Sequence, residues 1–143
     1  MLSVNFPPPN FKIKKVEDKE QIWDPSRKKW VRLTPEEWVR QNFIQFLVEE
    51  KKYPASLISI EKTIRLGEMK KRYDIVVFKN ALPWLIIECK EMNVPLSENV
   101  AQQILRYNST MLAPYLIITN GREHFGWEIN EGRGMSLTEL PDW

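Results

Sequence analysis

Two neighbouring apolar segments, 72–78 and 84–90, constrain the fold of this chain more than any other feature. In both segments side chains alternate with period two, and the short turn Asn80-Ala81-Leu82 separates them just before Pro83. The pattern predicts an antiparallel β-hairpin. Its nearly all-apolar face carries Tyr73, Ile75, Val77, Leu85, Ile87 and Cys89. The opposite face is also partly apolar, which is typical of a sheet covered on both sides.

The second face of this hairpin changes from apolar to charged along its length. If Ala81 is the centre of the turn, the opposed pairs are Phe78 with Trp84, Val76 with Ile86, Asp74 with Glu88, and Arg72 with Lys90. Directly opposed like charges destabilise a strand pair, and carboxylates near a covered sheet carry a desolvation cost. A divalent cation such as Mg²⁺, which one or two carboxylates can hold, would offset both effects. The alternative is a surface cluster in which Asp74 and Glu88 pair with Arg72 and Lys90.

The rest of the chain predicts helices that pack on such a sheet. Thr34-Pro35-Glu36-Glu37 is a helix start, with Thr34 as N-cap and Glu37 completing a capping box, and this helix should run to about residue 51. A second helix is expected at about 97–111, and further strands at 57–66, 115–119 and about 124–129. This order predicts an α/β fold with a mixed sheet. We expect one domain, with an N-terminal hairpin extension at 1–33 and a core at 34–143.

Composition excludes several kinds of site. The single cysteine, Cys89, excludes an internal disulfide framework and cysteine-based zinc sites. The single histidine, His124, would have to carry any Ser–His–Asp triad, and we expect it to be structural instead. The start of the chain lacks the features of a signal peptide, and no apolar run approaches the roughly 18–20 residues of a membrane span. We therefore expect a cytoplasmic protein without membrane contact.

The basic residues are clustered, although the net charge is only +2. Clusters matter more than totals for contact with phosphates, so they are compatible with a nucleic-acid partner. For any one cluster, ordinary solvated lysines are an alternative of at least equal weight. The clusters are Lys12, Lys14 and Lys15; Arg27, Lys28, Lys29 and Arg32; and Lys70, Lys71 and Arg72.

At this point the residues resemble a known superfamily. Asp74 followed by Glu88-Cys89-Lys90 resembles the Asp…Glu-x-Lys signature of PD-(D/E)XK nucleases, with Tyr73 in place of the nominal proline. The more extensive resemblance, over roughly residues 20–130, is to the N-terminal nuclease domain of type I restriction enzyme R subunits and their small stand-alone relatives. This resemblance rests on the first helix from Thr34, strands 72–78 and 87–90, and the strand end Thr119-Asn120-Gly121. In addition, Gln103 and Tyr107 form a Gln-x-x-x-Tyr element that resembles the one in RecB-type nucleases.

The resemblance implies a restriction-endonuclease-like fold and a Mg²⁺- or Mn²⁺-dependent endodeoxyribonuclease acting in restriction, defence or repair. It implies that Asp74 and Glu88 bind the metal, that the carbonyl of Cys89 adds a ligand, and that Lys90 acts on the phosphate. Glu37 is a further candidate ligand, although its capping role explains it equally well.

The resemblance also implies that Gln103 and Tyr107, which share a helix face, orient the site and the DNA. The alternative places Tyr107 in the core and Gln103 in solvent. The roles of Glu61 and Asn120 are left open: Glu61 lies on the surface or reaches the site, and Asn120 caps the following segment or touches substrate.

The alternative function is a catalytically silent module of the same fold that binds nucleic acid or protein. Phosphodiester chemistry alone does not separate DNA from RNA as substrate, although we expect DNA. A homodimer or a partner subunit is compatible with the sequence. These 143 residues contain no Gly-x-x-x-x-Gly-Lys-Ser/Thr phosphate loop, so we expect no ATP-dependent translocation from them.

Overall fold

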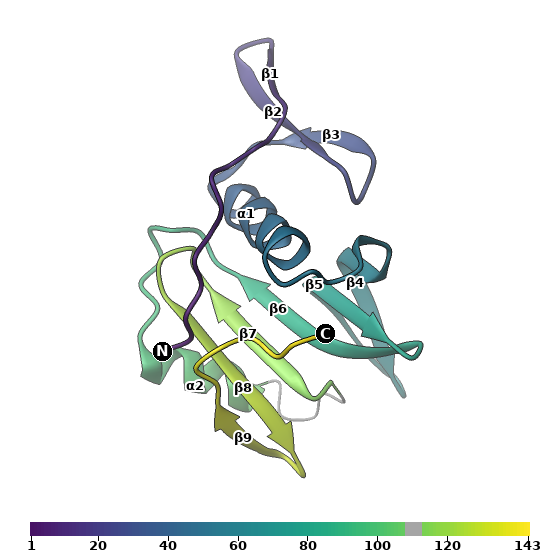
Figure 1. Cartoon of the computed structure of the whole chain (residues 1–143), viewed down its shortest axis with the longest axis vertical. Helices are drawn as coiled ribbons and strands as arrows, with labels where there is room; N and C mark the ends of the chain where they lie inside the picture. Colours follow the sequence, from purple (N-terminus) through teal and green to yellow (C-terminus); the bar gives the residue numbers. More distant parts are fainter. Residues whose placement is uncertain (108–112) are drawn as a thin grey trace.

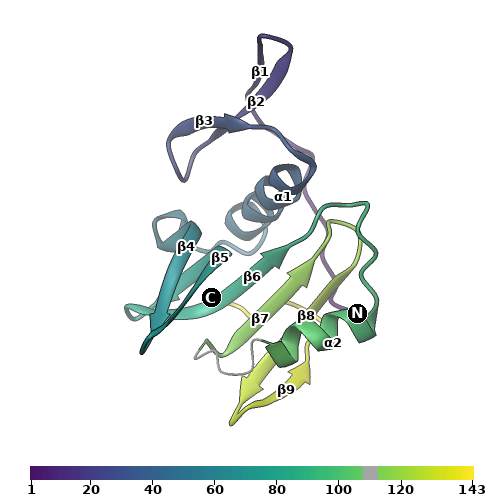
Figure 2. The same cartoon turned by 180° about the vertical axis from the view of Figure 1, so that it is seen from behind.

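A computed structural model of the chain describes residues 1–107 and 113–143, without the side chains of Leu66 and Tyr107. Its main body is a six-stranded mixed sheet with the strand order β4-β5-β6-β7-β8-β9. Helix α1 (Pro35–Glu49) covers one face of this sheet, and α2 (Glu98–Tyr107) covers the other, as Figures 1 and 2 show from opposite sides. The expected α/β fold is confirmed, with a helix, three strands, a second helix and further strands in the predicted order.

The strands lie close to their predicted positions. The sheet consists of β4 (Ile58–Leu66), β5 (Met69–Lys79), β6 (Leu82–Cys89), β7 (Tyr115–Thr119), β8 (His124–Asn130) and β9 (Arg133–Ser136), and a short helix η1 (Ala55–Leu57) precedes β4. β6 and β7 are parallel, and α2 lies in the connection between them; the other neighbours are antiparallel. The edge strand β9 was not expected from the sequence.

The central hairpin has the predicted register in its inner part. Val76 pairs with Ile86, as expected. Near the turn a bulge shifts the register, so that Phe78 pairs with Pro83 and not with Trp84. The turn consists of Asn80 and Ala81, both with positive φ. A two-residue turn of this kind matches the right-handed twist of the strands, whereas the sequence suggested a three-residue loop.

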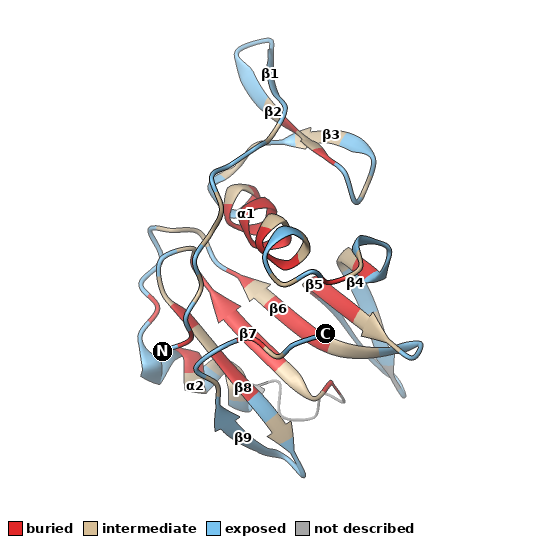
Figure 3. Ribbon diagram, viewed as in Figure 1, coloured by how far each residue is buried: buried red, intermediate tan, exposed pale blue. Residues whose placement is uncertain are grey.

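The core divides into two clusters, one on each face of the sheet. The α1-side cluster joins Val39, Phe43 and Leu47 of the helix to Ile75 and Ile87 of the sheet. The α2-side cluster includes Ala101 of the helix and Tyr73, Val76, Ile86 and Leu116 of the sheet. Figure 3 shows the buried residues concentrated in the middle strands and on α1. Burial on both faces explains the nearly continuous apolar sequences of β5 and β6.

The N-terminal residues form a separate three-stranded antiparallel sheet. It consists of β1 (Ile13–Val16), β2 (Lys19–Asp24) and β3 (Lys29–Arg32), in that order. Figures 1 and 2 both place α1 between this small sheet and the six-stranded sheet. Among the described residues, no helix is long and apolar enough to cross a membrane.

His124 begins β8 and is buried beneath α1. Its Nδ1 lies 2.7 Å from the Thr119 hydroxyl, and its ring packs edge-on against Phe6 and Phe43. Burial lowers the pKa of His124 to about 4, although the neighbouring carboxylate of Glu123 acts in the opposite direction. The imidazole is therefore neutral in the folded protein at neutral pH.

We expect acidification from pH 6.5 to pH 5 to destabilise the protein through His124. The unfolded chain binds a proton near the ordinary histidine pKa, whereas the folded protein binds it only near pH 4. The free energy of unfolding is therefore unaffected above pH 6.5 and falls with pH by about 2 kcal/mol over this interval. Urea unfolding of wild type and His124→Gln at several pH values measures this contribution. The same pH dependence in both proteins would contradict it.

Candidate active site

Asp74 lies in β5 at a step where the alternation of side chains breaks. Ile75 packs in the α1-side cluster, whereas Tyr73 packs in the α2-side cluster. In a regular strand these two side chains would share a face. Opposite Asp74 on β4, Glu61 has a φ of +51°. This conformation is strained in residues other than glycine and is concentrated at functional sites.

The carboxylate of Asp74 is held between α1 and the end of β6. Its Oδ1 accepts a hydrogen bond from Nη2 of Arg40 at 3.0 Å, and its Oδ2 accepts one from the backbone N–H of Cys89 at 2.8 Å. The side chain remains 23% exposed. Asp74 is thus fixed by two donors and still accessible to solvent.

Glu88 binds a different basic residue. Its Oε1 accepts from the ammonium of Lys71 at 3.0 Å, and the side chain is only 13% exposed. Burial raises the pKa of Tyr73, and the charge of Glu88 raises it further. Glu88 thus contacts Lys71 of β5, whereas Asp74 contacts Arg40 of α1. The two carboxylates have different basic partners in the structure, and their expected common face stays a prediction.

The structure places Glu36 beside Asp74, at the N-terminal end of α1. Partial burial raises the pKa of Glu36, and the carboxylate of Asp74, which is within hydrogen-bond reach, raises it further. Arg40 and Lys90 act in the opposite direction. The Glu36 side chain is 49% exposed. Two carboxyl groups thus meet at an accessible position, and the sequence analysis did not identify Glu36 as a site residue.

Glu37, the candidate from the sequence, is buried in a different environment. Thr34 caps the helix as predicted, accepting from the backbone N–H of Glu37 at 3.1 Å. The Glu37 carboxylate does not complete a capping box, because it accepts instead from Arg27, Arg40 and Gln41. Its ligand role remains a prediction, and its contacts are those of a structural carboxylate.

Arg40 connects these carboxylates. This guanidinium is buried and contacts Glu37 at 2.5 Å, Asp74 at 3.0 Å, Glu36 at 3.6 Å and Glu61 at 3.8 Å. Burial opposes its charge, but Glu37 and Asp74 outweigh burial and raise the pKa of Arg40. Arg40 therefore stays charged and fixes the carboxylates around it.

Arg27 extends the same network to the N-terminal sheet. It lies in the turn between β2 and β3, contacts Asp24, and reaches Glu37 at 2.7 Å and Glu61 at 3.3 Å. Arg72 closes the network by binding Glu61 at 2.5 Å. Burial tends to raise the pKa of Glu61, but Arg72, Arg40 and Arg27 outweigh it and lower that pKa. Glu61 thus reaches the site as a partner of arginines.

Lys90 and Cys89 follow directly at the end of β6. The backbone N–H of Lys90 donates to the carbonyl of Thr119 at 2.8 Å, which fixes the chain at this point. The Lys90 side chain is exposed, and its charge acts on Glu36. Cys89 is buried; burial and the nearby charge of Asp74 raise the pKa of its thiol, so the thiol stays protonated.

The remaining sequence candidates lie outside this network. Gln103 is exposed on α2, which packs on the opposite face of the sheet from α1. The side chain of Tyr107 lies outside the described residues, so the pairing of the two is untested. Asn120 is buried; it donates to the carbonyl of Val94 at 2.9 Å and accepts from the backbone N–H of Glu123 at 2.7 Å. These contacts are those of a turn-forming asparagine.

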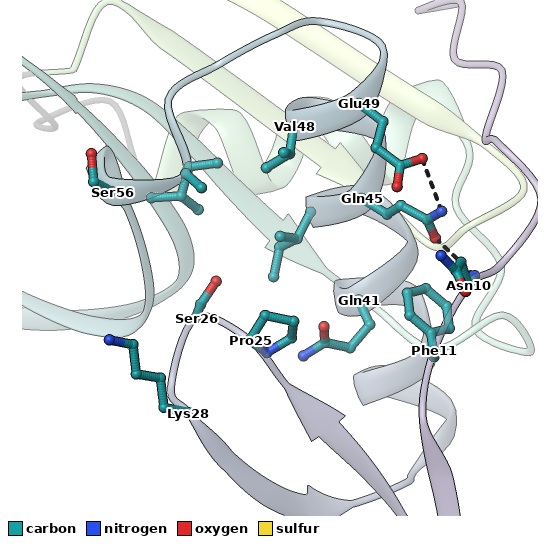
Figure 4. A pocket seen from close by; sticks show the side chains of 13 residues that line it. Asn10, Phe11, Pro25, Ser26, Lys28, Gln41, Gln45, Val48, Glu49 and Ser56 are labelled. Carbon is teal, nitrogen blue, oxygen red and sulfur yellow. Dashed lines mark hydrogen bonds between the residues drawn. The ribbon is translucent and has the colours of Figure 1, made fainter.

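A cavity of about 500 Å³ lies near the arginine network, between α1 and the turn joining β2 to β3. Figure 4 shows Gln45 bonded to Asn10 and Glu49 at its rim. Gln41 links the cavity to the network by donating to Glu37 at 3.1 Å. Asp74, Glu88 and Lys90 do not line it, so it is distinct from the carboxylate site.

The donor set of the candidate site matches the ligand preference of Mg²⁺. Asp74, Glu88 and the carbonyl of Cys89 supply the hard oxygen ligands that this ion prefers, and one or two carboxylates are its usual protein ligands. Within residues 1–107 and 113–143, however, no three His, Cys, Asp or Glu side chains are grouped around one point. The chemistry fits a weakly held ion that competes with Arg40 for Asp74 and with Lys71 for Glu88.

Comparison with known proteins identifies the family. The family model described as type I restriction enzyme R protein N terminus matches residues 35–141. The match begins with α1 and includes the six-stranded sheet, α2 and every candidate site residue, whereas β1, β2 and β3 lie before it. Searches of curated proteins and of solved structures found no match. Because the family model covers most of the chain, the protein belongs to the family of the type I restriction enzyme R protein N terminus.

Proposed function

We propose that this protein is a metal-dependent nuclease that hydrolyses phosphodiester bonds in DNA. The observation that carries the proposal is the meeting of Glu36 and Asp74 at an accessible position, where both contact Nη2 of Arg40, at 3.6 Å and 3.0 Å. Two adjacent carboxylates attract a cation, and a nearby ammonium attracts a phosphate. Family membership supports the same reading, since the family is defined on a restriction enzyme subunit.

The residues that would hold the metal are Asp74, Glu88 and the carbonyl of Cys89. Glu36 joins this set in place of Glu37, because its carboxyl group is within reach of Asp74. Bound Mg²⁺ would polarise the scissile phosphate and lower the pKa of a coordinated water.

The other residues position this site and stabilise charge. Arg40 and the backbone N–H of Cys89 fix the orientation of the Asp74 carboxylate. Lys90, exposed at the end of β6, would contact a phosphate of the substrate. Its ammonium stabilises the negative charge that grows on that phosphate as the reaction proceeds.

The second candidate function is the silent binding module. The ion pairs of Asp74 with Arg40 and of Glu88 with Lys71 favour it, because they neutralise both carboxylates without a metal. The two functions differ in whether a divalent ion displaces these basic partners.

Mg²⁺ or Mn²⁺ should raise the thermal midpoint of unfolding of wild type in a concentration-dependent way. A ligand that binds only the folded state stabilises it by mass action, by about 2.7 kcal/mol at 100 times its dissociation constant. Asp74→Asn should abolish this shift because it removes a charged ligand while retaining an acceptor for Arg40. An unchanged shift in Asp74→Asn would mean that the ions bind elsewhere.

Cleavage assays test the proposed activity. Supercoiled plasmid and a structured RNA are incubated with the protein in Mg²⁺, Mn²⁺ or EDTA. We expect nicking of the plasmid with either metal and none with EDTA. Metal-dependent cleavage of the RNA alone would contradict the assignment of DNA as substrate.

A further inference from the structure

Charge is sorted between the two faces of the small N-terminal sheet. Cross-strand pairing places Lys14 beside Gln21, Gln21 beside Arg32, and Trp23 beside Trp30. Because side chains alternate along each strand, one face carries Lys14, Val16, Lys19, Gln21, Trp23, Trp30 and Arg32. This set, called the basic face below, holds three cations and no carboxylate in its strands.

The opposite face is electrically balanced and partly buried. Its two lysines, Lys15 and Lys29, are matched by Glu20 and Asp24 in the same strands. Ile22 and Asp24 on this face are completely buried. The lysines of this face are exposed, as are all three cations of the basic face. The sheet therefore presents its unbalanced positive charge to solvent.

Aromatic side chains hold the basic face in place. The ammonium of Lys14 lies 4.3 Å from the ring centre of Trp30, and the rings of Trp30 and Trp23 contact each other edge to face at 5.6 Å. Single-stranded nucleic acid is usually bound by stacking bases on open aromatic rings. Here both rings are half-buried and Trp30 already carries Lys14. The face is suited to phosphate contacts and not to base stacking.

The small sheet is linked to the candidate active site through its β2–β3 turn and the face opposite to the basic face. Arg27, in the turn between β2 and β3, binds Glu37 at the start of α1 and Glu61 opposite Asp74. The small sheet is thus joined by ion pairs to the network that holds Asp74.

We propose that the basic face binds the sugar–phosphate backbone of duplex DNA. The choice of DNA as the polyanion rests on the proposed function. Lysine and arginine contacts to phosphates supply the sequence-independent part of DNA affinity, and they release counterions. The surface lies before the residues matched by the family model, so it is an addition to the shared core.

The test measures binding of a short labelled duplex by fluorescence anisotropy in EDTA, which separates binding from cleavage. The salt concentration is varied from about 50 to about 200 mM. Lys14→Gln/Arg32→Gln removes two cations from the basic face. The matched control, Lys15→Gln/Lys29→Gln, removes two cations from the same strands on the opposite face. Thermal midpoints verify folding, and the single variant Lys19→Gln keeps the test available if the double variant unfolds.

We expect the basic-face double variant to reduce the slope of log affinity against log salt by about 1.8, which corresponds to two lost phosphate contacts. Lys19→Gln should reduce the slope by about 0.9, and the control should bind like wild type. Equal losses in the basic-face and control variants, or no loss in either, would overturn the proposal. Tighter binding of a single strand through the same residues would also overturn it.

Binding and cleavage can fail separately. If wild type binds duplex through the basic face but cleaves nothing in Mg²⁺ or Mn²⁺, the surface is retained and the proposed nuclease function is wrong. If wild type cleaves DNA and the basic-face variant binds like wild type, the nuclease function is retained and the proposed surface is wrong.

Discussion

Arg40→Met should lower the free energy of unfolding by about 3–5 kcal/mol, because removing one partner of a buried ion pair leaves the other uncompensated. Arg40 is only 5% exposed and lies among Glu36, Glu37 and Asp74. Methionine keeps most of the apolar stem and removes the charge, so the loss is chiefly electrostatic. Urea unfolding at neutral pH, followed by tryptophan fluorescence, measures the change.

Two further variants complete this experiment: one keeps the positive charge at position 40, and the other makes the same arginine-to-methionine change at an exposed position. Arg40→Lys keeps a cation but loses the planar fork that binds two carboxylates, so its loss should be smaller than that of Arg40→Met. Arg106→Met, at an exposed position on α2, should stay within about 0.5 kcal/mol of wild type. A loss below about 1 kcal/mol in Arg40→Met would show that the arginine network is not important for stability.

Lys90→Ala should reduce the rate of DNA cleavage by about 100- to 1,000-fold, the usual cost of losing one electrostatic contact to a transition state. The substitution should leave folding and metal-induced stabilisation nearly unchanged, because Lys90 is exposed. Its charge acts mainly once the phosphate gains negative charge, so turnover should fall more than substrate affinity. Single-turnover plasmid cleavage measures the rate.

Lys52→Ala is the matched control for Lys90→Ala. Lys52 is also exposed, but it lies beyond the C-terminal end of α1, and a helix of this length separates its two ends by roughly 20 Å. We expect its rate to equal that of wild type. Equal rates for Lys90→Ala and wild type would refute the role given to Lys90, even if the protein is a nuclease.

Much of the fold could be predicted from the sequence because its signals are local or strongly periodic. The Thr34 cap fixed the start of α1, and the apolar alternation predicted β5 and β6 with the pairing of Val76 and Ile86. The bulge near Phe78 could not be predicted, because it depends on a two-residue turn competing with a three-residue loop. The edge strand β9 (Arg133–Ser136) has only four residues, too short a segment for a periodic signal.

The candidate site was predicted less well because it depends on distortion and on helix rotation. The rule of strict alternation put Asp74 and Glu88 on one face, whereas the strained backbone at Glu61 accompanies a break in that alternation. Adjacent glutamates on a helix point about 100° apart, so only the packing of α1 decides that Glu36 reaches Asp74. The sequence shows that Glu36 and Asp74 carry carboxylates, but it does not show where these side chains point.

The most direct test of the central claim is plasmid cleavage by wild type and Glu88→Ala, measured side by side in Mg²⁺, Mn²⁺ and EDTA. Glu88 binds Lys71 in the structure, and a metal at Glu88 would have to displace this lysine. The proposed mechanism predicts metal-dependent nicking by wild type and none by Glu88→Ala. Circular dichroism verifies that both proteins are folded. Cleavage by Glu88→Ala at the wild-type rate, or no cleavage by wild type with either metal, would contradict it.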